Sequence, residues 1–171
     1  DRMDQGIAGQ ESIAENMVSN RYASREFCRG GLLDYKKIDT FADENIRSYE
    51  IRCFGNSQNV EMLSGGNMQK VVVARECSHD PKVLIAEQPT RGVDIGAIEY
   101  IHQHLMQMRD SGSAILLISA DLDEVIKLAD RIAVLYEGRV VAEKETGAFT
   151  KTELGYYMLG GNARKEAADN D

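Results

Sequence analysis

Residues 63–70, with the sequence LSGGNMQK, combine a hydroxyl and two glycines where a helix is expected to begin. Ser64 can cap that helix, and Gly65 and Gly66 leave the N–H groups of its first turn uncovered. Such a helix start offers a hydroxyl, unpaired donors and the positive end of the helix dipole to an anion. The segment predicts a phosphate-sized site without a lysine; an ordinary serine cap followed by flexible glycines is the alternative.

A second chemical pattern stands at the end of an apolar run, in residues 83–88 with the sequence VLIAEQ. Phosphate-handling strands often end in two adjacent acids, one that holds magnesium and one that activates water. Here the pair is Glu87 and Gln88. The pattern therefore indicates a catalyst, an impaired catalyst, or a site that only resembles one.

Both patterns lie within an expected alternation of helices and strands. Ser12 and Glu15 have the spacing of a capping box, and apolar residues at helical spacing predict a second helix further on. From residue 63 onward helix and strand alternate, which predicts a parallel sheet covered on both faces. A hairpin around a Glu-Gly turn follows it. The expected ranges are helices over 12–20, 34–50, 67–78, 95–110, 121–129 and 152–159, with strands over 83–86 and 114–119.

The composition excludes several classes of protein. The 171 residues include 20 Lys and Arg against 28 Asp and Glu, a formal charge of −8, so binding of nucleic acid or anionic lipid by bulk charge is disfavoured. The three cysteines are far apart and odd in number, which fits neither a disulfide framework nor a zinc site. No apolar stretch approaches the ~20 residues of a membrane helix. We expect a soluble protein of a reducing cytosol.

The two histidines of the expected helix over 95–110 lie two residues apart, at His102 and His104. Residues at this spacing point away from one another on a helix. We expect both to be solvated rather than to ligate a metal.

The order and spacing of these motifs resemble those of the ATPases of ATP-binding cassette (ABC) transporters. Residues 63–66 match the signature motif, 83–88 the Walker B strand, 91–94 (RGVD) the D-loop and 115–121 the strand before the switch-histidine loop. The resemblance covers most of residues 60–145. Stretches such as QPTRGVDIGAIEYIH and DRIAVLYEGRVV resemble the second cassette of double-cassette ATPases for bacterial import of simple sugars or nucleosides, with the nucleoside branch nearer.

The resemblance implies an α/β fold, a partial P-loop NTPase cassette with a parallel sheet, helices and a C-terminal hairpin, next to a helical subdomain. The expected domains are a helical subdomain with the signature helix over 1–78, an α/β ATPase core part over 79–148, and a C-terminal helix with a disordered tail over 149–171. No G-x-x-x-x-G-K-[ST] pattern occurs. We therefore expect a fragment that begins after Walker A and that, alone, binds ATP poorly and is inactive.

On the signature side, the resemblance implies that Ser64, Gly65 and Gly66 contact the ATP held by the Walker A of a neighbouring cassette. Gln69 would support this site as a binding residue, together with Lys70. Asp94 would lie at the interface between the two cassettes. ATP is the implied cofactor of the intact subunit.

On the Walker B side, the resemblance implies a degenerate catalytic site. Glu87 stands where the family has its magnesium-coordinating Asp, and its longer carboxylate could hold Mg²⁺ through water. Gln88 replaces the water-activating Glu, and a neutral amide orients water but does not accept its proton. Losing a general base removes about 10²- to 10⁴-fold in rate. Ala120 occupies the position of the switch histidine.

The resemblance also implies partners: the first cassette of the same polypeptide, transmembrane permease subunits and, indirectly, a solute-binding protein, but no nucleic acid. The implied location is cytoplasmic, on the inner face of the cell membrane. Sheet edges left open in a fragment could pair two copies as a homodimer.

A competing hypothesis is a non-catalytic regulatory or assembly module with the shape of a cassette. Gln88 and Ala120 favour it, and the intact signature opposes it. An unrelated receiver-like domain would need acids at other strand ends, which the sequence lacks.

Overall fold

The computed structural model describes residues 6–161, which divide into two compact units. The first unit holds the residues up to Leu84 together with Pro89–Ile115. The second holds Ile85–Gln88 together with the residues from Leu116 onward. The domain limits expected at residues 78 and 148 stay a prediction, and the polar tail over 162–171 lies outside the described residues.

The first unit is mainly helical, and its helices begin where the sequence places capping residues. Ser12 and Glu15 form the predicted capping box, with the Ser12 N–H donating to Glu15 Oε2 at 2.9 Å. Asp34 caps the second helix and Asp94 the fourth. The elements are α1 (Ile13–Val18), β1 (Cys28–Arg29), β2 (Leu32–Leu33), α2 (Tyr35–Ser48), a 3₁₀ turn (Val60–Met62), α3 (Gly65–Cys77) and α4 (Ile95–Asp110).

The glycine pair at residues 30 and 31, where the sequence indicates a break, is the turn of a small antiparallel hairpin. β1 pairs with β2 through Cys28 opposite Leu33 and Arg29 opposite Leu32. Gly30 and Gly31 have φ angles of 62° and 84°, which glycine adopts without a steric penalty. This two-residue pairing is too short to leave a strand pattern in the sequence.

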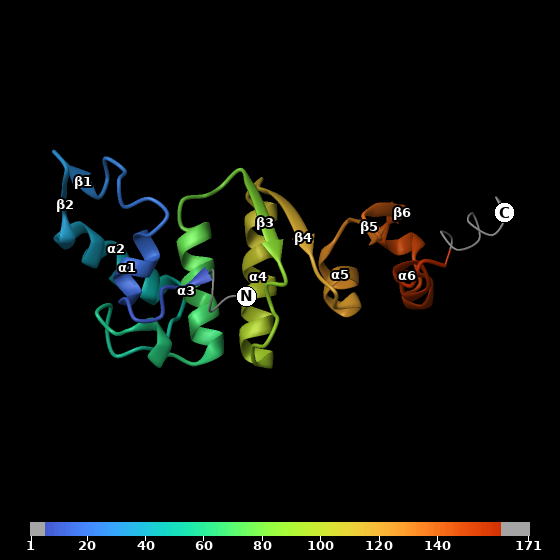
Figure 1. The fold of residues 1–171 in the computed structure, drawn as a ribbon, viewed down its shortest axis with the longest axis horizontal. Helices are drawn as coiled ribbons and strands as arrows, with labels where there is room; N and C mark the ends of the chain where they lie inside the picture. Colours follow the sequence, from blue (N-terminus) through green and yellow to red (C-terminus); the bar gives the residue numbers. More distant parts are fainter. Residues whose placement is uncertain (1–5, 162–171) are drawn as a thin grey trace. The chain divides into compact units, whose positions relative to one another are not determined.

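α1, α2 and α3 pack around one apolar core (Figure 1). Ile13 and Met17 of α1 and Val71 of α3 are almost fully buried. Ile38 and Ala42 of α2 are buried as well, which explains why the amphipathic pattern predicts that helix correctly. The largest fully buried apolar side chains of this core are Phe27, Ile13, Met17, Val60 and Val71.

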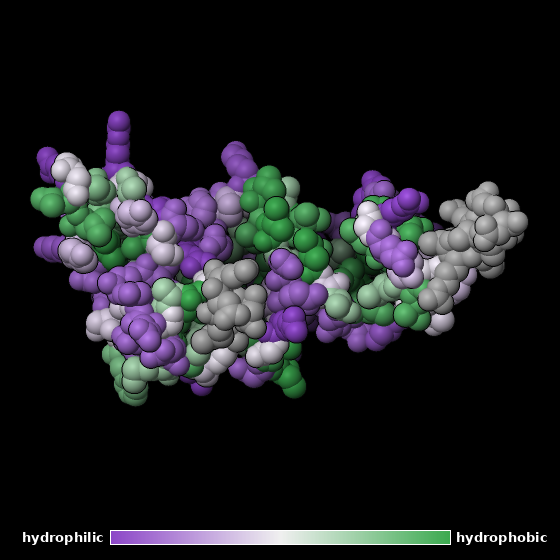
Figure 2. Space-filling model, in the orientation of Figure 1, coloured by the Kyte–Doolittle hydropathy of each residue, from purple (hydrophilic) through white to green (hydrophobic). Residues whose placement is uncertain are grey.

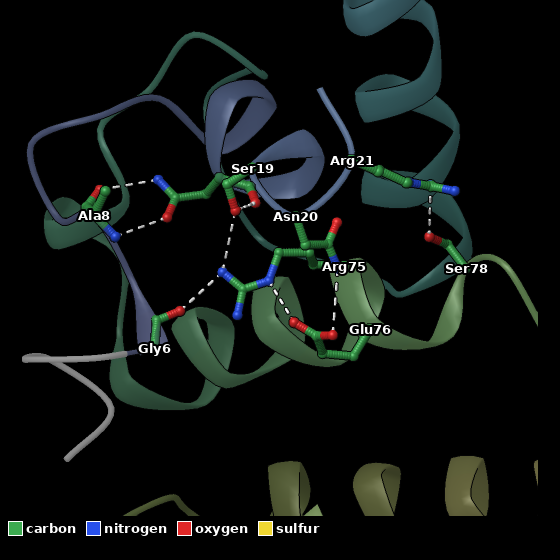
Figure 3. Close-up of polar contacts among 9 residues, drawn as sticks. Gly6, Ala8, Ser19, Asn20, Arg21, Arg75, Glu76 and Ser78 are labelled. Carbon is green, nitrogen blue, oxygen red and sulfur yellow. Dashed lines mark hydrogen bonds and ion pairs between the residues drawn. The ribbon is translucent and has the colours of Figure 1, made fainter. Parts of the chain in front are cut away.

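Polar contacts hold the C-terminal half of α3 against the segment around α1 (Figure 3). Arg75 Nη1 donates to the carbonyl oxygen of Gly6 at 2.9 Å and to Ser19 Oγ at 3.4 Å. Arg21 Nη2 donates to Ser78 Oγ at 3.1 Å, and Asn20 Nδ2 donates to Glu76 Oε2 at 3.3 Å. These bonds and the core beneath them fix the position of α3.

The strands β3 (Val83–Glu87) and β4 (Ala114–Ile118) form a two-stranded sheet. The Ala114 N–H donates to Lys82 O at 2.9 Å, and the Gln88 N–H donates to Ile118 O at 2.7 Å. The first residues of the two strands therefore lie side by side, and so do their last residues. The two strands run in the same direction, so the predicted parallel pairing is correct.

The expectation that this sheet is covered on both faces is wrong for one face. Alternate residues of both strands are exposed, and Figure 2 shows apolar surface over β3 and β4. Leu84 and Ile115, on the other face, pack on the core. Two strands bury one row of side chains only, because nothing within residues 6–161 covers the other. The exposed row consists of Val83, Ile85, Leu116 and Ile118.

The second unit contains the predicted helix and hairpin. The strands β5 (Arg131–Tyr136) and β6 (Arg139–Glu145) pair antiparallel around Glu137 and Gly138, whose φ angles of 46° and 76° are those of a type I′ hairpin turn. Its core consists of Ile132, Val134, Phe149 and Leu154. The elements are α5 (Leu122–Leu128), β5 (Arg131–Tyr136), β6 (Arg139–Glu145), a 3₁₀ turn (Thr146–Ala148) and α6 (Lys151–Met158).

No helix within the described part of the chain has the length and the apolar character needed to cross a membrane.

Candidate functional site

Ser64 is the N-cap of α3, as predicted. Its Oγ accepts hydrogen bonds from the Asn67 N–H at 3.4 Å and from Asn67 Nδ2 at 2.9 Å. Ser64 is exposed, and Gly65 begins the helix behind it. The arrangement leaves the positive end of a 13-residue helix open to an anion.

Gly66 lies where the starts of α3 and α4 approach most closely. A Cβ atom at this position would stand 2.6 Å from Asp94 Oδ2 and 3.0 Å from the Cβ of Ala97. Asp94 is held there because its Oδ1 caps α4, accepting from the Ala97 N–H at 2.9 Å. A side chain at position 66 would therefore displace the Asp94 carboxylate or move the two helix starts apart. The signature segment and the end of the D-loop segment are therefore neighbours within one unit, which the sequence did not predict.

A pocket of about 670 Å³ opens between the two helix starts. Its wall carries the cations of Arg52 and Lys70 and the anions of Glu50, Asp94 and Glu99, so its charge is mixed. A phosphate would be bound by the local donors of α3 rather than by a positive field. The lining residues are Glu50, Ile51, Arg52, Ser64, Gly66, Asn67, Lys70, Asp94, Gly96, Ala97, Glu99, Tyr100 and Gln103.

Lys70 adds to the pocket a cation that the LSGG pattern alone does not predict. Its Nζ donates to the carbonyl oxygen of Glu50 at 3.0 Å and lies 4.2 Å from the centre of the Tyr100 ring. Both contacts hold the ammonium at the wall. Gln69, predicted as a binding residue, is half-buried on α3 and does not line the pocket.

The two histidines of α4 are packed rather than solvated, so that expectation is wrong. His102 is only 6% exposed. His104 stacks on Tyr100 with 6.1 Å between ring centres and tilts against Tyr49 at 4.7 Å. Burial lowers the pKa of His104 and raises the pKa of Tyr100 to about 12, so both rings are neutral at pH 7. The helix α4 packs on α3, and this contact covers one face of α4. The spacing of the histidines alone does not show which face of the helix is covered.

The other predicted site residues lie at the ends of β3 and β4, in the second unit. Glu87 is exposed at the last position of β3, and Ala120 is exposed two residues after β4. Gln88 is half-buried with a φ angle of 46°, and its N–H joins it to Ile118 at the end of β4. The parallel pairing thus brings the ends of β3 and β4, with the residues that follow them, side by side.

The chemistry available at these strand ends is limited. Within residues 6–161, no group of three His, Cys, Asp or Glu side chains could hold a metal ion. Glu87 offers a single carboxylate, Gln88 a neutral amide and Ala120 no polar atom. Glu87 can share in coordinating a cation brought by a ligand and can accept a proton, Gln88 can orient water, and the Ala120 side chain can do neither.

Asn67 is a site residue that the motif analysis passed over. It joins Ser64 to the loop before α3, since its Oδ1 accepts from the Arg52 N–H at 2.8 Å. Its position could have predicted this role, because Asn67 lies in the first turn of the helix, three residues after the capping Ser64, and a side chain there can reach back to the cap.

Solved structures share the fold of this chain. The dimeric structure of the bacterial ABC transporter cassette MJ0796 matches 82% of this chain and 59% of its own, with a TM-score of 0.65 and 23% identity. The ABC transporter cassette MJ1267 matches 93% of this chain and 63% of its own, with a TM-score of 0.67 and 20% identity. The chain has the fold of part of an ABC ATPase cassette, which confirms the predicted fold class.

Sequence relatives narrow the class. The nucleoside import ATP-binding protein NupA of Lactococcus lactis is 43% identical over 95% of this chain and 32% of its own length. The guanosine import ATP-binding protein NupO of Bacillus subtilis is 40% identical over 98% and 32%. The glucose import ATP-binding protein TsgD13 of Haloferax volcanii is 40% identical over 94% and 30%. No protein-family model matches the sequence.

The chain is therefore homologous to the ABC import ATP-binding proteins over nearly its whole length, and it spans about a third of the length of these curated relatives.

Proposed function

We propose that the chain supplies the signature side of a composite ATP site that powers the import of a nucleoside or a simple sugar. The start of α3 at Ser64, Gly65 and Gly66, open to the pocket beside Asp94, is the observation that carries this proposal. The relatives described as importing nucleosides, guanosine and glucose support the class of solute.

The chemistry of this side is binding. The Ser64 hydroxyl and the uncovered N–H groups of α3 would donate hydrogen bonds to the terminal phosphate of an ATP. That ATP would be held by the first cassette of the same polypeptide. Charge-assisted hydrogen bonds of this kind contribute about 1.5–3 kcal/mol each. Closure of the two cassettes on ATP would then move transmembrane permease subunits, and only indirectly a solute-binding protein. The protein would work at the inner face of the cell membrane.

The strand ends supply little of the hydrolysis. Gln88 cannot take the proton of an attacking water, and Ala120 cannot reach a phosphate. Glu87 would touch Mg²⁺ through water, with the ion brought by the nucleotide's own phosphates. Hydrolysis is assigned to the acids of the partner cassette, and the chain alone, which has no G-x-x-x-x-G-K-[ST] pattern, should bind ATP weakly and be inactive.

The substitution Ser64→Arg in the intact subunit with its permease tests the proposal. The long cation would fill the mouth of the pocket, so ATP-driven uptake and ATP hydrolysis should both be abolished. Ser12→Arg is the matched control, because it removes an equivalent cap from α1 and does not line the pocket. Normal uptake by the Ser64→Arg protein would refute the proposal.

The competing function is a non-catalytic regulatory or assembly module, favoured by the neutral side chains of Gln88 and Ala120. The double substitution Gln88→Glu with Ala120→His in the intact protein separates the two. On the main proposal the change adds or alters ATP hydrolysis, while uptake already works without it. If deletion of the whole region left transport unharmed, the region would be dispensable for transport and the main proposal would be wrong.

A further inference from the structure

We infer that Asn67 is a positioning residue that turns the hydroxyl hydrogen of Ser64 toward the pocket, where a phosphate oxygen can accept it. The inference rests on the proposed function, since it takes Ser64 to contact the nucleotide. It concerns a residue to which the motif assigned no role.

The orientation of the Asn67 amide is fixed by its neighbour. The backbone N–H of Arg52 lies 2.8 Å from Asn67 Oδ1, and a backbone N–H can only donate. The oxygen of the amide must therefore face Arg52. The amide nitrogen then faces Ser64, at 2.9 Å from Oγ.

The orientation of the amide in turn decides the direction of the Ser64 hydroxyl. An amide nitrogen carries only hydrogens to donate, so Ser64 Oγ accepts from it. Oγ also accepts from the Asn67 N–H at 3.4 Å. A serine hydroxyl has two lone pairs and one hydrogen, so the lone pairs are directed to Asn67 and the hydrogen is directed away from it.

The remaining direction leads into the pocket. Ser64 is exposed and lines the pocket, and among residues 6–161 no acceptor pairs with its hydroxyl hydrogen. A donor that is already oriented needs no rearrangement when negative charge arrives, which is what makes preorganised donors effective. Asn67 therefore acts on the nucleotide through Ser64, without having to touch it.

The near-isosteric substitution Asn67→Asp reverses the direction of the hydrogen bond between residue 67 and Ser64, because it replaces the donating amide nitrogen with an accepting oxygen. One carboxylate oxygen keeps the bond from the Arg52 N–H, while the other accepts the Ser64 hydrogen and turns it away from the pocket. In the intact subunit with its permease, kcat/KM for ATP hydrolysis should fall about 10- to 100-fold, and Ser64→Ala should cause a similar fall, because each change removes one charge-assisted hydrogen bond. The melting temperature should stay close to that of the unmodified protein.

A double-mutant cycle isolates the path through Ser64. In the Ser64→Ala background there is no hydroxyl to misdirect, so Asn67→Asp should lower kcat/KM by no more than about twofold further. The added negative charge is present in both backgrounds, so a loss caused by charge or by altered packing would persist in the alanine background. An equal loss in both backgrounds overturns the inference.

Asn67→Leu provides a neutral second variant if the aspartate protein does not fold. It removes the orienting donor but leaves the hydroxyl able to rotate, so a loss of about threefold is expected, and this loss should vanish in the Ser64→Ala background. A loss that remains there contradicts the inference. If Ser64→Ala itself left hydrolysis unchanged, the proposed function would be wrong. If Ser64→Ala lowered hydrolysis but Asn67→Asp did not, only the role of Asn67 would be refuted.

Discussion

The pocket at the starts of α3 and α4 and the ends of β3 and β4 hold the two groups of residues predicted to handle a nucleotide, and the two places are built differently. In the pocket, Gly66 and Asp94 fit against one another, and Asp94 caps a helix. At the strand ends, Glu87 and Ala120 are exposed, and neither makes a comparable contact.

On the proposed function, this difference would explain how the pocket stays intact while the strand ends are degenerate. On the proposed function the pocket residues serve both the fold and the binding of an anion, so their replacement should cost stability as well as binding. The strand-end residues hold little of the fold, so their chemical groups can be lost without unfolding the chain. Substitutions that separate stability from function can test this contrast.

Gly66→Ala should be the most damaging of these changes. The new Cβ would stand 2.6 Å from Asp94 Oδ2 and 3.0 Å from Ala97 Cβ, so the Asp94 side chain must shift away from its capping position or the helix starts must move apart. Overpacking of this kind costs about 1–3 kcal/mol. Chemical denaturation should show this loss in the free energy of unfolding, together with loss of ATP-driven uptake. Gly147→Ala is the matched control, because nothing lies within 4 Å of a Cβ there; similar losses from both variants would contradict the contrast.

Two helix caps, one in each region, offer a direct comparison. Asp94 caps α4 at the pocket, and Asp121 caps α5 after the end of β4. Loss of either cap by substitution with Ala should cost about 1 kcal/mol in the free energy of unfolding. Only Asp94→Ala should also change the ATP dependence of uptake by the intact protein. Equal effects on uptake would show that the two regions do not differ in function.

Gln88→Gly should change stability in the opposite direction to Gly66→Ala. Gln88 has a φ angle of 46°, a left-handed conformation that costs a non-glycine residue roughly 1–2 kcal/mol. Glycine removes that cost but gains entropy in the unfolded chain. The net result should be a change between zero and about 1 kcal/mol in favour of folding, read from the denaturation midpoint. A clear destabilisation would mean that the Gln88 side chain holds the strand ends together.

The smallest expected effect is on the pH dependence of stability. Burial lowers the pKa of His104 below 6.5, so the folded state binds fewer protons than the unfolded state. Stability should be full above pH 6.5 and should decrease as the pH falls from 6.5 through the lowered pKa. His104→Phe keeps a ring against Tyr49 and Tyr100 but cannot titrate. Its free energy of unfolding should therefore fall less between pH 7 and pH 5, and an unchanged slope would exclude His104 as the cause.

Local patterns predicted most of the elements, because caps and periodicity act within a few residues. The Ser12–Glu15 capping box, the strands over 83–87 and 114–118 and the hairpin turn at Glu137 and Gly138 all follow from such patterns. Burial of His102 and exposure of one face of β3 and β4 did not follow, since both depend on which element packs against which.

The sequence by itself determined the type and order of the elements, the presence of the serine and glycine helix start, and the absence of a base at position 88. The tertiary structure decided that Gly66 meets Asp94, that Lys70 and Tyr100 complete the pocket wall, and that Asn67 joins Ser64 to Arg52. Capping and helix propensity are local and can be read along the chain. The approach of two helices is set by the packing of their faces, and residues 28 positions apart become neighbours only when both helices are in place.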